Sequence, residues 1–192
     1  ISLVGTKPFD EYKEAKALGI ETKPVLVGPF TLLKLIRFTG KKGIKDVVGD
    51  IIRVYTEVLA KYNELGVAWA QFDEPYLVYD LTGADIALFN DLYSAILNKK
   101  GNVKVLLQTY FGDVRDIYET LIKTNFDGIG LDFVEGIKTR ELVEKFGFPK
   151  TKKLFAGVLC GKNIWRNNYQ KSLETLNFLK ENSSEAVSCP SI

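Results

Sequence analysis

Two adjacent carboxylates follow an apolar, strand-like run, VAWAQF at 67–72, and are themselves followed by Pro75. Proline lacks the N–H that a strand ladder needs, so the strand should end here and leave Asp73 and Glu74 at its carboxyl end. In parallel α/β folds, binding and catalytic groups collect at that end of the sheet. Paired carboxylates can bind an amino group, hold a divalent cation or act as acid and base. Because neighbouring strand residues face opposite ways, one acid should face the mouth of the sheet and the other the helix layer.

Polar groups follow other predicted strands as well: Tyr110 and Asp113 after 103–110, Asp132 and Glu135 after 128–133, and Lys162, Asn163 and Arg166 after 154–159. A structural role competes with a chemical one at each acid, because acids at strand ends also cap helices and pair with Lys or Arg. Asp113 precedes a predicted helix, and we expect it to act as the N-cap.

The aromatic and sulfur-containing side chains are predicted to be structural. Five aromatic residues are expected to pack in the core or between helix and sheet and not to form a stacking platform: Trp69, Tyr76, Tyr79, Phe111 and Trp165. Cys160 has no histidine to activate it and is expected to be a buried thiol. Cys160 and Cys189 lack the spacing of a metal site, and two cysteines do not form a disulfide framework.

The elements that must position these residues alternate regularly along the chain. Apolar residues with a helical period predict helices over 9–18, 31–38, 44–65, 84–97, 114–123, 139–146 and 169–181. Short apolar runs between them predict strands over 24–28, 67–73, 103–110, 128–133, 154–159 and 186–189.

Strands that are apolar on both faces and separated by helices indicate a parallel sheet covered by helices. The chain has no Gly-x-Gly-x-x-Gly after a strand and no phosphate loop, which disfavours the nucleotide-binding open sheets. The predicted fold is therefore α/β, a (βα)8 TIM barrel, incomplete because about six βα units are present and eight close the barrel. We expect 1–192 to be most of one barrel domain.

Composition narrows the function. The 192 residues include 26 basic and 24 acidic ones. This near balance produces no strong positive potential, so a polyanion such as nucleic acid is not expected as a partner. No apolar run has transmembrane length and no signal peptide opens the chain, so we expect no membrane partner. Because two cysteines do not form a disulfide framework, we expect a cytoplasmic, reducing compartment. The sequence contains no histidine and no methionine. Starting at Ile1 without methionine, it is expected to be a fragment or to lack modified methionines or whole stretches.

Five strings in one order carry a family resemblance: KPVLVGP (23–29), QFDEP with LVYDL (71–81), LQTYFGD (107–113), GLDFV (130–134) and KNIWR (162–166). Together they resemble the cobalamin-independent methionine synthases, specifically their N-terminal barrel, from about residue 7 to 180. The resemblance implies two face-to-face (βα)8 barrels and methyl transfer from 5-methyltetrahydropteroyl-polyglutamate to homocysteine, which forms methionine. It also implies a zinc ion in the C-terminal barrel that ionises the homocysteine thiol.

Departures from the family's zinc motif indicate that this barrel is not catalytic. Tyr110 and Gly112 stand where the zinc-binding barrel has its His and Cys, Asp132 stands where it has Glu, and Cys189 stands near its last Cys. Two remaining ligands cannot hold four-coordinate zinc, so no metal or other cofactor is expected here. By the same comparison, Asp73 matches an Asp that binds the homocysteine amino group in the other barrel.

The leading hypothesis is a non-catalytic scaffold that braces the C-terminal barrel and supports the folate tail, with the first strands and the catalytic barrel absent from this chain. No catalytic residue is expected in it. Asp73, Glu74, Tyr110, Asp113 and Asp132 are candidates for a vestigial substrate site. Two alternatives stay open: a stand-alone metal-dependent TIM-barrel lyase that uses the strand-end acids, and a small methyltransferase homologue.

Overall fold

The computed structural model describes residues 1–183 and 186–191, with the side chains described through 183. Its centre is a sheet of six parallel strands in the order in which they occur along the chain: β1 (Val25–Val27), β2 (Trp69–Asp73), β3 (Lys104–Gln108), β4 (Gly128–Asp132), β5 (Lys153–Cys160) and β6 (Ala186–Ser191). Consecutive parallel order is the arrangement of a (βα)n barrel. The predicted fold class, an incomplete barrel, is confirmed.

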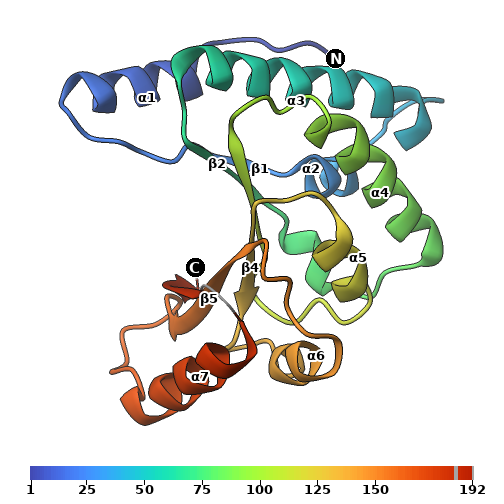
Figure 1. The fold of residues 1–192 in the computed structure, drawn as a ribbon. Helices are drawn as coiled ribbons and strands as arrows, with labels where there is room; N and C mark the ends of the chain where they lie inside the picture. Colours follow the sequence, from blue (N-terminus) through green and yellow to red (C-terminus); the bar gives the residue numbers. More distant parts are fainter. Residues whose placement is uncertain (184–185, 192) are drawn as a thin grey trace.

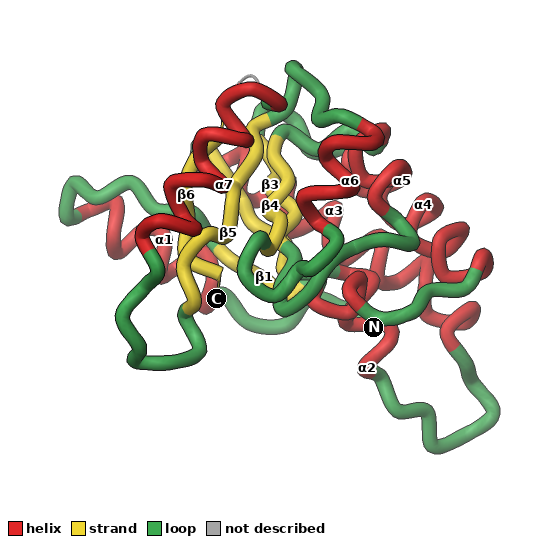
Figure 2. Tube along the Cα trace, turned by 90° about the horizontal axis from the view of Figure 1, so that it is seen from below, coloured by secondary structure: helices red, strands yellow, loops and turns green. Residues whose placement is uncertain are grey.

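One helix precedes β1, and one or two helices lie between each pair of consecutive strands. The helices are arranged around the outside of the curved sheet (Figures 1 and 2). They are α1 (Lys7–Ala17), α2 (Pro29–Leu35), α3 (Ile44–Leu65), α4 (Gly83–Leu97), α5 (Tyr118–Lys123), α6 (Thr139–Phe146) and α7 (Tyr169–Asn182), with a 3₁₀ turn, η1 (Pro75–Val78), after β2. The predicted helix over 114–123 begins four residues later than expected, at Tyr118. The other elements lie where the apolar pattern predicts them, with ends displaced by a few residues.

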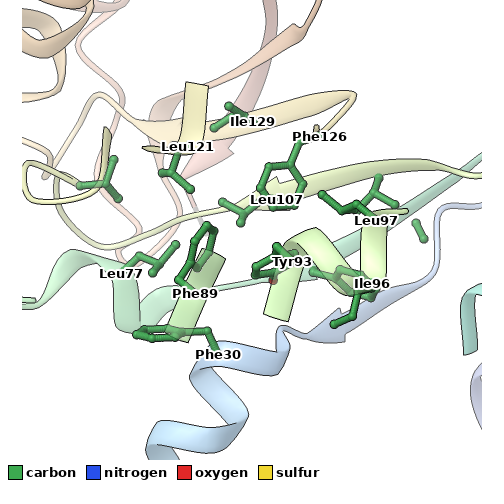
Figure 3. Close-up of a cluster of buried hydrophobic side chains, with 14 of the residues drawn as sticks. Phe30, Leu77, Phe89, Tyr93, Ile96, Leu97, Leu107, Leu121, Phe126 and Ile129 are labelled. Carbon is green, nitrogen blue, oxygen red and sulfur yellow. The ribbon is translucent and has the colours of Figure 1, made fainter. Parts of the chain in front are cut away.

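The main core lies between the helices and the outer face of the sheet. Phe89, Tyr93 and Ile96 of α4 are fully buried against Leu107 of β3 and Ile129 of β4 (Figure 3). Phe126 extends this aromatic group, with ring centroids 4.8 Å from Tyr93. Burying large apolar side chains on this one face fixes which residues of every strand point outward.

The inner face of the sheet carries the alternate residues. A Cβ atom added at Gly128 would contact the side chains of Trp69, Leu106 and Phe155. These three residues therefore lie together on that face. On β1 the alternate residues Val25 and Val27 are each 49% exposed. The inner face is therefore only partly covered along β1.

Candidate functional site

Asp73 ends β2 on the inner face, in register with Val27 of β1 and Gln108 of β3. One carboxylate oxygen accepts a hydrogen bond from Gln71 Nε2 at 2.7 Å. The other accepts one from the Tyr110 hydroxyl at 3.0 Å. Burial and then the neighbouring Asp73 carboxylate raise the pKa of Tyr110, so its hydroxyl is a neutral donor across the usual pH range. Asp73 is half-buried, and this small network holds it in one orientation.

Glu74 points the opposite way, as strand alternation predicts. Its carboxylate is fully buried and accepts hydrogen bonds from the backbone N–H groups of Phe30 at 2.9 Å and Thr31 at 2.6 Å. The Tyr93 hydroxyl donates a third at 2.5 Å. Phe30 and Thr31 lie in the first turn of α2, whose orphan N–H groups Glu74 therefore satisfies. The two adjacent acids do not form a pair: Glu74 joins β2 to two helices, and Asp73 faces the mouth.

Burial raises the pKa of Glu74 to about 7, while the hydrogen bonds from Thr31, Tyr93 and Phe30 lower it and offset part of that shift. Burial, followed by the charge of Glu74, raises the pKa of Tyr93 well above its usual value. A buried carboxyl group with such a pKa can resemble a catalytic acid. Here no surface of Glu74 is open to a substrate, so its role is structural.

Asp113 does not cap α5, which corrects the sequence-based expectation. Its carboxylate is almost fully buried and binds the Arg115 guanidinium at 2.6 Å and 2.9 Å. It also accepts a hydrogen bond from the Lys138 N–H at 3.2 Å. Asp113 therefore ties the loop after β3 to the loop after β4.

Asp132 ends β4 and is also buried. Its Oδ1 accepts hydrogen bonds from the N–H groups of Val134 at 2.7 Å and Glu135 at 2.9 Å, which closes a turn after the strand. Its Oδ2 is buried, and within the described part of the chain it has no hydrogen-bond partner. Asp132 thus shapes the mouth of the sheet from a position separate from the Asp73 network.

The structure therefore divides the five predicted site residues into separate environments. Only Asp73 and Tyr110 are in direct contact. Among residues 1–183, whose side chains are described, no group of three or more His, Cys, Asp or Glu side chains lies close enough to hold a metal ion. The side chain of Cys189 lies outside the described part.

A zinc ion of the family type does not fit the residues present after β3. Tyr110 is a neutral phenol engaged with Asp73, and Gly112 has no side chain. The magnesium-dependent alternative needs several converging oxygen ligands, and the acids described above point to different partners.

Sequence reasoning missed a cleft of about 700 Å³ beside the loop between β5 and α7. Trp165, expected in the core, is 79% exposed there, and Tyr79 elsewhere is 64% exposed. Phe111 is 38% exposed, and Cys160 is half-buried instead of buried. The run NIWRNN at 163–168 mixes amide side chains with an aromatic and a cationic one. Such a polar composition predicts an exposed loop.

Six parallel strands in consecutive order, joined by helices, define an α/β protein of the (βα) barrel class. The model of one family, described as "Cobalamin-independent synthase, N-terminal domain", matches residues 1–184. The chain belongs to this family, and the resemblance drawn from its motifs is confirmed.

Curated relatives at high identity bear one name, 5-methyltetrahydropteroyltriglutamate--homocysteine methyltransferase. That of Bifidobacterium longum is 55% identical over 185 residues, covering 94% of this chain and 24% of the relative. That of Campylobacter jejuni is 51% identical over 187 residues, covering 97% of this chain and 25% of the relative. The chain thus spans about a quarter of the length of these relatives.

Solved structures support the fold. A B12-independent methionine synthase from Shewanella sp. W3-18-1, in complex with selenomethionine, matches with a TM-score of 0.74 at 17% identity, over 100% of this chain and 60% of that one. A methyltransferase from Methanosarcina mazei matches with a TM-score of 0.64 at 14% identity, over 93% of this chain and 56% of that one. None of the helices described here is long and apolar enough to cross a membrane.

Proposed function

We propose that this chain forms most of the N-terminal barrel of an enzyme that transfers a methyl group from 5-methyltetrahydropteroyl-polyglutamate to homocysteine. In that reaction the bond from the folate nitrogen to the methyl carbon breaks, a carbon–sulfur bond forms, and the folate nitrogen takes up a proton. The names and the extent of the curated relatives support this proposal. We place the enzyme in the cytoplasm, consistent with a chain that has no disulfide framework.

Within that enzyme we propose that this barrel is a scaffold that takes no part in the chemistry. The proposal rests on the hydrogen bonding of Asp73, which is the one candidate acid that faces the mouth of the sheet. Both of its carboxylate oxygens accept hydrogen bonds from the same chain, one from Gln71 and one from Tyr110. Zinc, when the enzyme holds it, would belong to the C-terminal barrel and supply an ionised thiol. The residues here that correspond to its ligands include a tyrosine and a glycine.

The proposed partner is the C-terminal barrel of the same enzyme, and homocysteine and the folate polyglutamate are its proposed substrates. Several apolar side chains are exposed in the loops that follow the strands, which supports a contact with the C-terminal barrel at this end of the sheet. Ile137 is 91% exposed and Ile164 is 98% exposed, in the loops after β4 and β5. Apolar residues gathered at one end of a domain are typical of a contact surface.

The test uses the full-length enzyme that carries this chain, with Asp73→Asn and Tyr110→Phe as separate variants. We expect kcat and KM for methyl transfer to homocysteine within about threefold of the unmodified enzyme, because neither group contacts a substrate. A loss of kcat of about a hundredfold or more with intact folding would show that this barrel participates in catalysis. Absence of methyl transfer in the unmodified enzyme would overturn the proposed reaction.

A further inference from the structure

The loop between β5 and α7, whose Ile164 belongs to the proposed contact surface, also borders a cleft whose lining does not include Ile164. The cleft encloses about 700 Å³ and is lined by the end of β5, the start of α7 and Arg140 of α6. In Figure 1, α6 and α7 lie at the same end of the molecule as β5. Its volume falls in the range of small-molecule sites.

The charge of the cleft is positive. Arg166 and Lys171 line it, and neither has an ion-pair partner among the described residues. The Arg166 guanidinium instead lies 5.7 Å from the ring centroid of Tyr169. Arg140, the third cation, contacts Glu144 at 3.2 Å and lies over Phe178. One carboxylate of the described residues, Glu174, lines the cleft, and it accepts a hydrogen bond from Gln170 at 3.0 Å.

The polar side chains of the wall are held in place by one another. Asn167 Nδ2 donates to Ser172 Oγ at 2.9 Å, and Ser172 Oγ donates to the Val158 carbonyl at 3.0 Å, which fastens the start of α7 to β5. Asn163 Oδ1 accepts from the Trp165 N–H at 2.9 Å. These bonds fasten the start of α7, which carries Lys171, to β5 and to the loop that carries Arg166.

We propose that this cleft binds a small, multiply charged anion whose phosphate or carboxylate oxygens are held by Arg166, Lys171 and Arg140. Guanidinium groups bind such oxygens through two parallel hydrogen bonds, and a lysine adds a mobile charge. Three cations against one carboxylate leave the lining net positive, and a concave surface concentrates that field more than a flat one does. The first turn of α7, a helix of 14 residues, adds the positive end of its dipole.

A small ligand fits better than a polymeric anion. The whole chain has a formal net charge of +2, so its basic and acidic residues nearly balance and give no general attraction for a polyanion. Nucleic acid binding requires a cationic face that extends along several phosphates. The inference is independent of the proposed methyl transfer, because none of the three cations belongs to the Asp73 network.

The experiment measures binding of two probes, inorganic pyrophosphate and citrate, to the 192-residue chain by titration calorimetry at low ionic strength. The test variant is Arg166→Gln with Lys171→Gln. The matched control is Lys180→Gln, which removes the same kind of charge from the exposed C-terminal turn of the same helix, outside the cleft. Thermal melting of every variant establishes that it is folded.

We expect saturable binding of at least one probe at one site, weakened about tenfold or more in the double variant and unchanged within about twofold in the control. The stronger probe identifies the phosphate or the carboxylate form of the ligand. Binding should also weaken as salt is raised. The proposal fails if neither probe binds, or if the control variant and the double variant lose affinity equally, which would indicate nonspecific charge or a surface that only contacts protein.

Discussion

At the scale of single residues, the contact between Gly28 and Glu74 decides how β1, β2 and α2 meet. A side-chain carbon at position 28 would lie 2.2 Å from Cδ and 2.2 Å from Oε1 of Glu74. Glu74 is fully buried and held by three donors, so it has no free direction in which to move. We expect Gly28→Ala to lower the free energy of unfolding by about 3 kcal/mol, measured by chemical denaturation.

The matched control for this change is Gly49→Ala. Gly49 is exposed in the second turn of α3, and nothing lies within 4 Å of the added carbon. Alanine favours the helix, so the control should stabilise the chain by up to about 1 kcal/mol. Equal effects of the two substitutions would mean that the close approach at Gly28 is unimportant.

Glu74 should also make stability depend on pH. Its pKa is about 7 in the folded chain and near 4.5 when exposed, so between these values the folded state binds a proton that the unfolded state lacks. Stability contributed by this proton is fully present below about pH 4.5 and is lost as pH rises to about 7. We expect the chain to lose about 2 to 3 kcal/mol of stability between pH 5 and pH 8.

Glu74→Gln should remove that dependence, because an amide does not titrate. The chain has no histidine, so the interval from pH 5 to pH 8 is free of imidazole titration. Denaturant unfolding at several pH values compares the two proteins, with Glu141→Gln on the exposed face of α6 as control. A pH slope in Glu74→Gln as steep as in the unmodified chain would contradict the prediction.

What a sequence can predict at this scale is illustrated by three acids. The opposite orientations of Asp73 and Glu74 follow from strand alternation alone. The partners of Glu74 do not, because they lie 43 and 44 residues earlier in α2 and 19 later in α4. Asp113 looked like a helix cap because local capping is common, but Arg115 and the distant Lys138 N–H compete for its carboxylate.

At the scale of elements, Lys152 fastens the end of α5 to the start of β5. Its ammonium is buried and donates to the carbonyls of Thr124 at 2.6 Å and Phe126 at 3.0 Å. Thr124 is the C-cap of α5, where carbonyl groups lack helical partners. Burial lowers the pKa of Lys152, with nearby Asp127 opposing that shift.

We expect Lys152→Met to lower the free energy of unfolding by about 2 kcal/mol, because both carbonyls lose a charged donor while the apolar stem is kept. Chemical denaturation measures the difference. Lys99→Met, an exposed lysine after α4, is the control and should change stability by less than about 0.5 kcal/mol. A change at Lys152 no larger than at Lys99 would show that the helix end needs no such donor.

The same scale shows which element boundaries a sequence can predict. The helix over 44–65 was predicted with its observed bounds because it has a long apolar period and ends at Gly66, which adopts φ of 71°. The start of α5 was misplaced because 114–117 has helical composition. There the Ile117 N–H bonds to the Val114 carbonyl in a turn that leads directly into α5, and Asp113 is fixed by tertiary contacts.

At the scale of the whole molecule, the sequence could predict the parallel order of the sheet but not how far its inner face is covered. Consecutive βα units dictate strand order through short right-handed crossovers. The exposure of Val25 and Val27, both on the inner face of β1, depends on what lies beyond that edge strand. In the structure, β1 pairs with β2 along one edge, and its apolar side chains Val25 and Val27 lie on the inner face.

Exposed apolar residues on an edge strand favour association with other chains. We therefore expect the 192-residue chain to self-associate as its concentration rises. Val25→Lys with Val27→Lys should weaken that association about tenfold or more, because association would bury the two lysine charges in the interface. Sedimentation velocity over a concentration series measures it.

The control for this prediction adds the same two charges elsewhere. Val4→Lys with Leu18→Lys changes residues that are 88% and 73% exposed, away from β1. If association is driven by net charge alone, both double variants should weaken it equally; if the inner face of β1 drives it, only the first should. A chain that stays monomeric at every concentration would show that partial exposure of this face is tolerated. The inner face of β1 would then be a stable surface of the domain.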